Sequence, residues 1–300
     1  MISISGVLNI NKPAGVTSSE YMNYIKNKFK IKKIGYAGTI DKFAEGVLPL
    51  LLNKATRLAQ WIDLSKKVYM AKIKLGIETD TNDITGEVIN EDKNFKLDIA
   101  ELLITLQKFI GEQEQIPPIF SAKKIKGKRA SDLVREGKEV KLKPNLITIY
   151  NIEVESVQEK ENIIELKISC SKGTFIRAFA RDLGMRLGTY GTVIELIRIK
   201  NGIFEIKDSI DKDVIEKVSD ISELNIISMS DALSYYPKLH LISSYKNIIF
   251  NGKFLNKFYF HNYEDIKKEG IYRVVDSENR LLALIELSKD NKFKYLRVFK

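Results

Sequence analysis

A glycine-punctuated loop that runs directly into an apolar segment is the feature that most limits how this chain can fold. The loop spans residues 34–46 and holds three glycines, which permit backbone conformations and close approaches that other residues disfavour. The run Val47 to Leu52 that follows predicts a buried segment able to hold the loop rigid. Asp41 lies in the middle of the loop, where it is either a catalytic carboxylate or an ordinary cap or turn residue.

The rest of the chain offers few alternatives to carboxylate chemistry. His240 and His261, the only two histidines, are far in sequence from Cys170, the only cysteine. This distribution gives no zinc-site spacing and no Cys-His pair. The sequence also has no glycine-rich motif of the kinds that bind nucleotide phosphates or dinucleotides. We therefore expect a reaction without metal or cofactor.

Positive charge is concentrated in two segments of a chain whose net charge is +10. Residues 121–143 hold nine Lys or Arg against three carboxylates, and residues 26–33 hold five lysines. Such clusters favour binding to a polyphosphate backbone, although a solvated lysine-rich surface is the alternative interpretation.

Length and composition place the protein in a broad class. A chain of 300 residues with 44% hydrophobic residues can bury a full core and is long enough for about two domains. A single cysteine excludes an intramolecular disulfide, and no apolar run approaches the roughly 18 residues that span a bilayer. The sequence thus predicts a cytoplasmic protein with no membrane contact, and nothing in it demands more than a monomer.

The pattern of hydrophobic residues predicts an α+β fold with a mixed, mostly antiparallel sheet rather than a doubly wound one. Thr17 and Glu20 form a capping-box pattern before a helix whose apolar face carries Tyr21, Ile25 and Phe29. Helices are expected at residues 97–110 and 175–187. Strands are expected at residues 6–10, 71–75 (with Tyr69 near the start), 148–156, 163–169 and 193–199.

Beyond about residue 228 the pattern changes to short strands joined by polar turns. Residues 271–276, 281–287 and 293–299 predict three strands, with Asn251-Gly252 as a candidate earlier turn. We therefore divide the chain into residues 1–227 and a small all-β domain of residues 228–300.

Several short motifs, taken together and in order, resemble the TruB family, the tRNA pseudouridine synthases that isomerise the T-loop uridine at tRNA position 55. The loop matches the family signature in its glycines and in Thr39, Asp41, Ala44 and Val47-Leu48-Pro49. It departs from that signature at Tyr36, Ile40 and Lys42, where the family has His, Leu and Pro. The other matching segments are Gly6–Ser18, Lys67-Val68-Tyr69, Leu75-Gly76, Thr79–Gly86, Gln115–Lys124 and Ser171–Arg177.

The resemblance implies a role for each matching residue. Asp41 would be the nucleophile, Tyr69 the aromatic side chain that supports a flipped-out base, and Arg177 the partner that keeps Asp41 ionised and oriented. Phe175 and Ile199 would line the uracil pocket with apolar side chains, although core packing explains them equally well. Whether Asp41 attacks the sugar or the base stays open.

Further residues are candidate substrate contacts. Tyr36 takes the place of the family histidine that enters the space left by flipped nucleotides, and it keeps a planar ring with a polar tip. Lys12 of the opening motif and Lys123 and Lys124 of the basic segment are candidate RNA contacts.

The resemblance also implies a fold and a function. The fold would be a large, mostly antiparallel sheet with a central catalytic cleft, followed by a PUA-like RNA-binding domain at residues 228–300. The expected activity is isomerisation of uridine 55 in the T-arm of tRNA. The alternative is a tRNA-binding or folding factor that keeps the scaffold without the chemistry.

Overall fold

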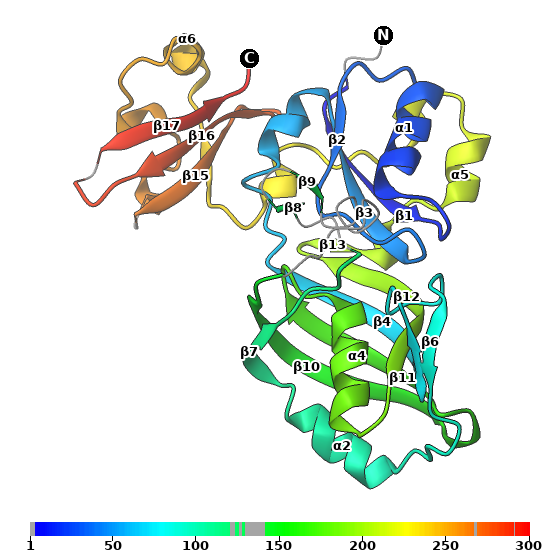
Figure 1. The fold of residues 1–300 in the computed structure, drawn as a ribbon. Helices are drawn as coiled ribbons and strands as arrows, with labels where there is room; N and C mark the ends of the chain where they lie inside the picture. Colours follow the sequence, from blue (N-terminus) through cyan, green and yellow to red (C-terminus); the bar gives the residue numbers. More distant parts are fainter. Residues whose placement is uncertain (1–3, 121–123, 126–127, 130–141, 267–268, 291) are drawn as a thin grey trace.

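The computed structural model describes residues 4–120, 124–125, 128–129, 142–266, 269–290 and 292–300. A nine-stranded sheet organises the first two thirds of the chain, with the strand order β1-β3-β12-β4-β11-β10-β7 (Figure 1). Strand β2 pairs with β3 and β13 pairs with β12, beside this path. The strands of this sheet are β1 (Gly6–Lys12), β2 (Ile34–Tyr36), β3 (Glu45–Leu52), β4 (Lys66–Leu75), β7 (Gly111–Gln115), β10 (Asn145–Gln158), β11 (Ile163–Ser171), β12 (Gly191–Asn201) and β13 (Phe204–Glu205).

The predicted mixed α/β class with a mostly antiparallel sheet is confirmed. Strand β4 pairs antiparallel with both β11 and β12, whereas β12 meets β3 in parallel. The predicted hairpin around residues 159–161 is also confirmed, since β10 and β11 pair on either side of a 3₁₀ turn there. Two short hairpins lie outside this sheet: β5 (Ile77–Thr79) with β6 (Val88–Glu91), and β8 (Lys124–Ile125) with β9 (Lys128–Arg129).

Two of the helices begin at a side-chain cap. Helix α1 (Ser18–Lys28) starts with the predicted capping box, in which Thr17 Oγ1 accepts from the Glu20 N–H and the Glu20 carboxylate accepts from the Thr17 N–H. Helix α2 (Ile99–Gln107) is shorter than predicted because the Asp98 side chain caps its first N–H groups. The other α-helices of the described residues are α4 (Ile176–Arg186), α5 (Lys212–Lys217) and α6 (Lys246–Phe250).

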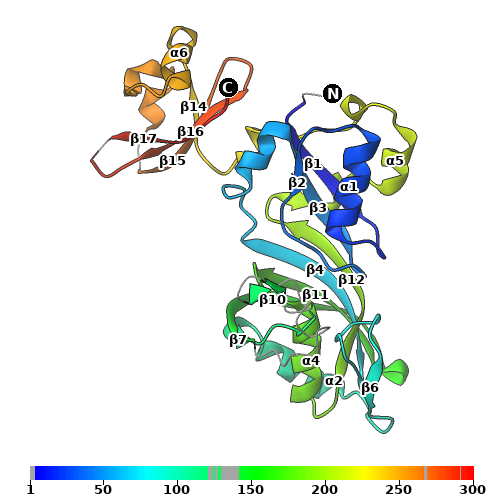
Figure 2. The same ribbon diagram turned by 45° about the horizontal axis from the view of Figure 1, so that its top comes forward.

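The large sheet carries different helices on its two halves. Helices α2 and α4 cover the half built from β4, β10, β11 and β12, and they share one hydrophobic cluster with those strands (Figure 1). Helix α1 packs instead on β1 and β3, in a second cluster that includes residues of α5. Figure 2 shows the same division from another angle. No helix in the described residues is long and apolar enough to span a membrane.

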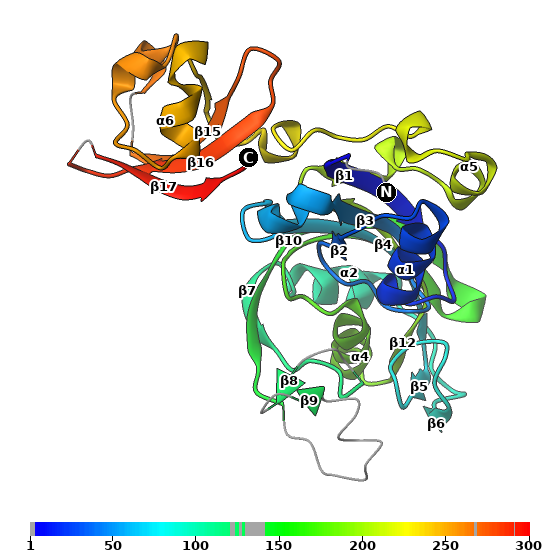
Figure 3. The same cartoon turned by 90° about the horizontal axis from the view of Figure 1, so that it is seen from above.

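A four-stranded sheet forms the C-terminal part of the molecule, in the order β14-β15-β16-β17. Its strands are β14 (Lys238–His240), β15 (Gly270–Val275), β16 (Leu281–Leu287) and β17 (Phe293–Val298). The last three were predicted, whereas β14 is an additional edge strand that pairs in parallel with β15. This sheet lies beside the half of the large sheet that contains β1 and β3 (Figure 3).

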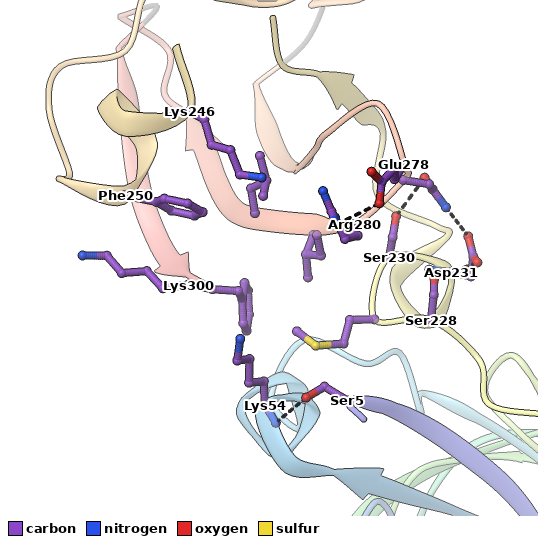
Figure 4. Close-up of a pocket in the computed structure, with 15 residues that line it drawn as sticks. Ser5, Lys54, Ser228, Ser230, Asp231, Lys246, Phe250, Glu278, Arg280 and Lys300 are labelled. Atoms are coloured by element: carbon purple, nitrogen blue, oxygen red, sulfur yellow. Dashed lines mark hydrogen bonds and ion pairs between the residues drawn. The ribbon is translucent and has the colours of Figure 1, made fainter. Parts of the chain in front are cut away.

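The two sheets meet through a shared hydrophobic cluster. Leu281, Leu284 and Phe299 from the C-terminal part join Leu51 and Leu58 from the first part in this cluster. At the same junction a pocket of about 580 Å³ opens, with Lys54 from the first part and Lys300 from the second at its edge (Figure 4). No residue of the loop 34–46 lines this junction pocket.

Candidate active site

A second pocket, of about 320 Å³, contains Asp41. It lies where the glycine-punctuated loop approaches strand β4 and the first turn of helix α4. Its lining residues are Thr39, Ile40, Asp41, Lys67, Tyr69, Asn145, Gly173, Thr174, Phe175, Ile176 and Leu196. Five segments that are distant in sequence therefore meet around this pocket.

Asp41 is held by a two-point ion pair with Arg177. Arg177 Nε donates to Asp41 Oδ2 at 2.9 Å, and Arg177 Nη2 donates to Asp41 Oδ1 at 3.0 Å. The arginine side chain is only 5% exposed, whereas that of Asp41 is 36% exposed. A two-point contact fixes the orientation of the carboxylate as well as its charge, so Asp41 faces the pocket in one defined orientation.

The guanidinium of Arg177 is anchored on its other side. Its Nη1 lies 3.2 Å from Asp83 Oδ2 and donates to the Thr81 carbonyl, while Nη2 also donates to the Phe120 carbonyl. The side chain of Asp83 is only 5% exposed. Arg177 thus carries two carboxylates, one buried and one facing the pocket, so a single cation satisfies both.

A tight turn positions Asp83, whose role the sequence analysis did not assign. Asp83 Oδ1 accepts from the hydroxyls of Thr81 and Thr85 and from the Thr85 N–H. These residues belong to the motif Thr79–Gly86. Gly86 closes the turn, since a Cβ there would lie 2.3 Å from an oxygen of Asp80. The motif was therefore a signal for this buried carboxylate, although its pairing with Arg177 required the fold.

Arg198 of β12 is a second buried arginine that the sequence analysis missed. Its side chain is fully buried and donates to the carbonyls of Gly38 and Thr39 in the loop and twice to that of Val47. These bonds hold the backbone just before Asp41. The available signal was a lone arginine in the apolar strand 193–199, but its partners could not be inferred from the pattern alone.

Tyr69 also lines the pocket of Asp41. It belongs to β4, is 6% exposed and pairs across the sheet with Arg198. Burial raises the pKa of the Tyr69 phenol to about 12. The hydroxyl is therefore protonated at neutral pH and can donate a hydrogen bond, while the ring offers a flat apolar surface.

Phe175 also lines the pocket, just before α4 begins. Its backbone is fixed by Gln115, whose Oε1 accepts from the Phe175 N–H while its Nε2 donates to the Phe175 carbonyl. Gln115, in turn, lies at the end of β7 in the motif Gln115–Lys124. These two hydrogen bonds connect the motif to the helix that carries Arg177.

Three of the predicted substrate contacts within the described residues do not line the pocket of Asp41. Leu196 and Arg198 share the face of Tyr69, whereas Ile199 lies at the register shift after Arg198 and does not continue that face, so Leu196 is the residue of β12 that lines the pocket. Lys12 is fully buried, and its ammonium donates to the carbonyls of the turn that follows β1, so it faces the interior rather than the pocket. Tyr36 is half-buried on β2 and packs against the cluster under α1.

The basic segment 121–143 lies largely outside the described residues. Lys123 lies outside the described residues, and Lys124 belongs to the short strand β8. Their predicted contacts with RNA therefore stay predictions. In the described ranges, no group of three or more His, Cys, Asp or Glu side chains is arranged to hold a metal ion.

Comparison with solved structures shows that this fold is shared. A chain in the structure of an H/ACA RNP bound to a substrate RNA containing 2′-deoxyuridine superposes with a TM-score of 0.72 and 22% identity, over 98% of this chain and 85% of that one. A chain in the crystal structure of a Cbf5-Nop10-Gar1 complex gives a TM-score of 0.72 at 23% identity, with the same coverage.

Comparison of sequences defines the family. The model of the TruB family pseudouridylate synthase N-terminal domain matches residues 26–176. The tRNA pseudouridine synthase B of Clostridium kluyveri is 36% identical over 99% of this chain and 100% of its own length. That of Thermotoga maritima is 34% identical over 96% of this chain and 92% of its own length. The chain therefore belongs to the TruB family of pseudouridylate synthases.

Proposed function

We propose that this chain isomerises uridine to pseudouridine at position 55 in the T-loop of tRNA, with Asp41 as the nucleophile. The observation that carries the proposal is the carboxylate of Asp41, oriented by the buried Arg177 at a pocket walled by Tyr69. The reaction breaks the bond between C1′ and N1 and forms one between C1′ and C5. A carboxylate can add to the substrate and later leave, as this exchange requires.

The pocket suits a single nucleoside that has left its stack. Tyr69 and Phe175 supply aromatic surface for the base, and Leu196 and Ile176 add apolar contacts. A stacked base in a folded loop could not reach Asp41 without flipping outward, because the carboxylate is partly enclosed by its neighbours. Arg177 then has the role of orienting the nucleophile rather than of contacting the RNA.

The alternative of a tRNA-binding factor without catalysis is not favoured. A carboxylate in a pocket repels the phosphates of RNA, so binding alone gives no reason for Asp41 to be held there by a buried arginine. The relatives from Clostridium kluyveri and Thermotoga maritima are likewise named as tRNA pseudouridine synthases, which are enzymes.

The proposal extends to the remainder of the chain. We infer that residues 1–227 form the catalytic domain and residues 228–300 a PUA-like domain that contacts the same tRNA. The net charge of +10 supports an RNA partner, and the sequence gives no reason to expect more than a monomer. A tRNA substrate and a single cysteine also support a cytoplasmic location.

Release of tritium from C5-labelled uridine in an unmodified tRNA transcript tests this function, because bond formation at C5 displaces its hydrogen. We expect release by the wild-type chain and at least about a 1,000-fold lower rate with Asp41→Asn, since loss of a covalent nucleophile removes the reaction path. Changing the T-loop target to cytidine should abolish release. Tight transcript binding without release by the wild-type chain would instead support the binding factor.

A further inference from the structure

Lys67 lines the pocket of Asp41, but it has no role in the reaction described above. It lies on β4 two residues before Tyr69, and because side chains alternate along a strand, both point to the same face of the sheet. Both line the pocket that contains Asp41. Lys67 pairs across the sheet with Cys170 of β11 and with Asn201 of β12.

The ammonium of Lys67 has no protein partner within the part of the chain that the structure describes: no hydrogen bond and no ion pair reaches it. Two other lysines of this part of the fold do have partners for their ammonium groups. Lys12 is fully buried, whereas Lys67 is half-buried, but the Lys12 ammonium donates to two carbonyls. Lys72, farther along β4, pairs with Glu195 at 3.1 Å. The carboxylate of Asp41 is already bound on both oxygens by Arg177.

The groups around Lys67 do not supply a negative charge either. Arg198 of β12 is a cation, and burial raises the pKa of the Cys170 thiol to about 11, which leaves it neutral. The Tyr69 phenol on the same strand is also neutral at pH 7. Burial, reinforced by Arg198, lowers the pKa of Lys67 to about 8. A partly desolvated cation costs free energy until an anion joins it.

We propose that Lys67 binds an anionic oxygen of the target nucleotide inside the catalytic pocket, an inference that rests on the function proposed above. A nucleotide that enters the pocket offers such an oxygen in two places. One is the phosphate that flanks the flipped nucleoside, which is anionic before the reaction starts. The other is a uracil carbonyl, which becomes anionic only during the reaction.

The second source follows from the bonds that change when Asp41 bonds to C1′. The electron pair of the C1′–N1 bond then remains on the base, and its charge spreads from N1 to the ring carbonyl oxygens. Lys67 would donate a hydrogen bond to that charge without giving up a proton. Attack of C5 on C1′ next displaces the Asp41 carboxylate, after which C5 loses its proton and N1 gains one.

Kinetic constants of Lys67→Met in the tritium-release assay test the inference. We expect roughly a 10- to 100-fold lower kcat/KM, the effect of losing one charge-assisted hydrogen bond. A phosphate contact would appear mainly in KM, because it exists in the bound substrate, whereas a contact with the uracil anion would appear mainly in kcat. Lys67→Arg should restore most of the activity in either case.

Lys66→Met is the matched control, because Lys66 is exposed on the opposite face of the same strand, where its ammonium lies over the Tyr150 ring. It should retain the kcat/KM of the wild-type chain. Lys67→Met should also be as stable toward urea as the wild type, since it removes a cation that burial disfavours. A loss of activity with unchanged stability separates substrate binding from a merely structural role.

The pH dependence provides an independent measurement. Because the lysine is charged only below its pKa, kcat/KM of the wild type should fall as the pH rises through about 8. Among the described residues, the charged or titratable groups near Lys67 are Arg198 and Cys170, together with Tyr69 and Asp41, which line the same pocket, and Cys170 and Tyr69 titrate at higher pH. Lys67→Arg should abolish this alkaline decrease, since arginine keeps its charge.

Unchanged kcat/KM in Lys67→Met, or an alkaline decrease that persists in Lys67→Arg, would overturn the inference while wild-type turnover upholds the proposed function. If the wild type shows no turnover, no uracil anion forms and the flanking phosphate is the one anionic oxygen left for Lys67, so the affinity of the chain for the transcript should fall in Lys67→Met. An unchanged affinity there would overturn the inference as well.

Discussion

At the scale of single residues, Arg177 has one partner that the sequence predicted, Asp41, and one that only the fold revealed, Asp83. The motifs predicted that Arg177 would pair with Asp41, and the structure has that pair, although the catalytic roles stay predictions. Asp83 was visible only as a member of a motif. Its position beneath Arg177 depends on the turn at residues 79–86 meeting helix α4, which no local pattern encodes.

Replacing Asp83 by Asn should therefore be costly. The change leaves the buried guanidinium with one carboxylate instead of two, and we expect the free energy of unfolding to fall by about 2 to 4 kcal/mol. Urea unfolding would measure this. Asp80→Asn is the control, because Asp80 is exposed and its side chain accepts one backbone hydrogen bond, from Glu87. It should cost less than about 1 kcal/mol, and equal losses for the two variants would contradict the buried ion pair.

At the scale of elements, periodicity predicted most of the strands and helices, because alternation and capping are local properties. It could not predict which strands become neighbours. The pairing of β12 with β4 contains two register shifts, and the regular stretch between them puts Leu196 on the same face of the sheet as Tyr69, whereas Ile199 falls outside that alternation. The same register brings Arg198 opposite Tyr69, where it can hold the loop of Asp41.

The contact between β3 and β12 yields a prediction at this scale. Gly46 has φ +112°, and a Cβ on it would lie 2.3 Å from the carbonyl oxygen of Arg198. Gly46→Ala must therefore push β3 away from β12, and we expect a loss of at least about 2 kcal/mol in the free energy of unfolding. The rate of tritium release should fall with it, because the displaced strand carries the loop of Asp41.

Gly35→Ala on neighbouring β2 is the matched control for that variant. A Cβ at Gly35 meets only a side-chain methyl of Thr56, at an ordinary contact distance of 3.8 Å. We expect its unfolding free energy to stay within about 1 kcal/mol of the wild type. A Gly46→Ala protein as stable as Gly35→Ala would show that the two strands do not approach each other this closely.

At the scale of the whole molecule, the predicted boundary at residue 228 stays a prediction, and the packing around it shows why sequence texture alone is insufficient. The composition changes at this residue, but the hydrophobic cluster at the junction contains residues from both sides of it. Leu281, Leu284 and Phe299 share it with Leu51 and Leu58. The C-terminal sheet also has a cluster of its own, which includes Phe260.

Two phenylalanines distinguish these two cores. Phe299 is 4% exposed in the shared cluster, and Phe260 is 1% exposed in the cluster of the C-terminal sheet alone. Either change to Ala should cost about 3 to 5 kcal/mol locally. Phe299→Ala should in addition weaken the packing of the C-terminal sheet against the first part of the chain, because it removes contacts in the cluster that both parts share. Its effect should therefore spread to the first part of the chain.

Hydrogen exchange resolved by segment measures that spread. With Phe299→Ala we expect faster exchange both in β16 and in residues 47–58, which belong to β3 and the 3₁₀ turn after it. With Phe260→Ala the faster exchange should stay within residues 238–298, because no residue of the first part belongs to its cluster. Unchanged exchange in residues 47–58 of Phe299→Ala would mean that the two parts are stable independently and that their shared cluster contributes little to either.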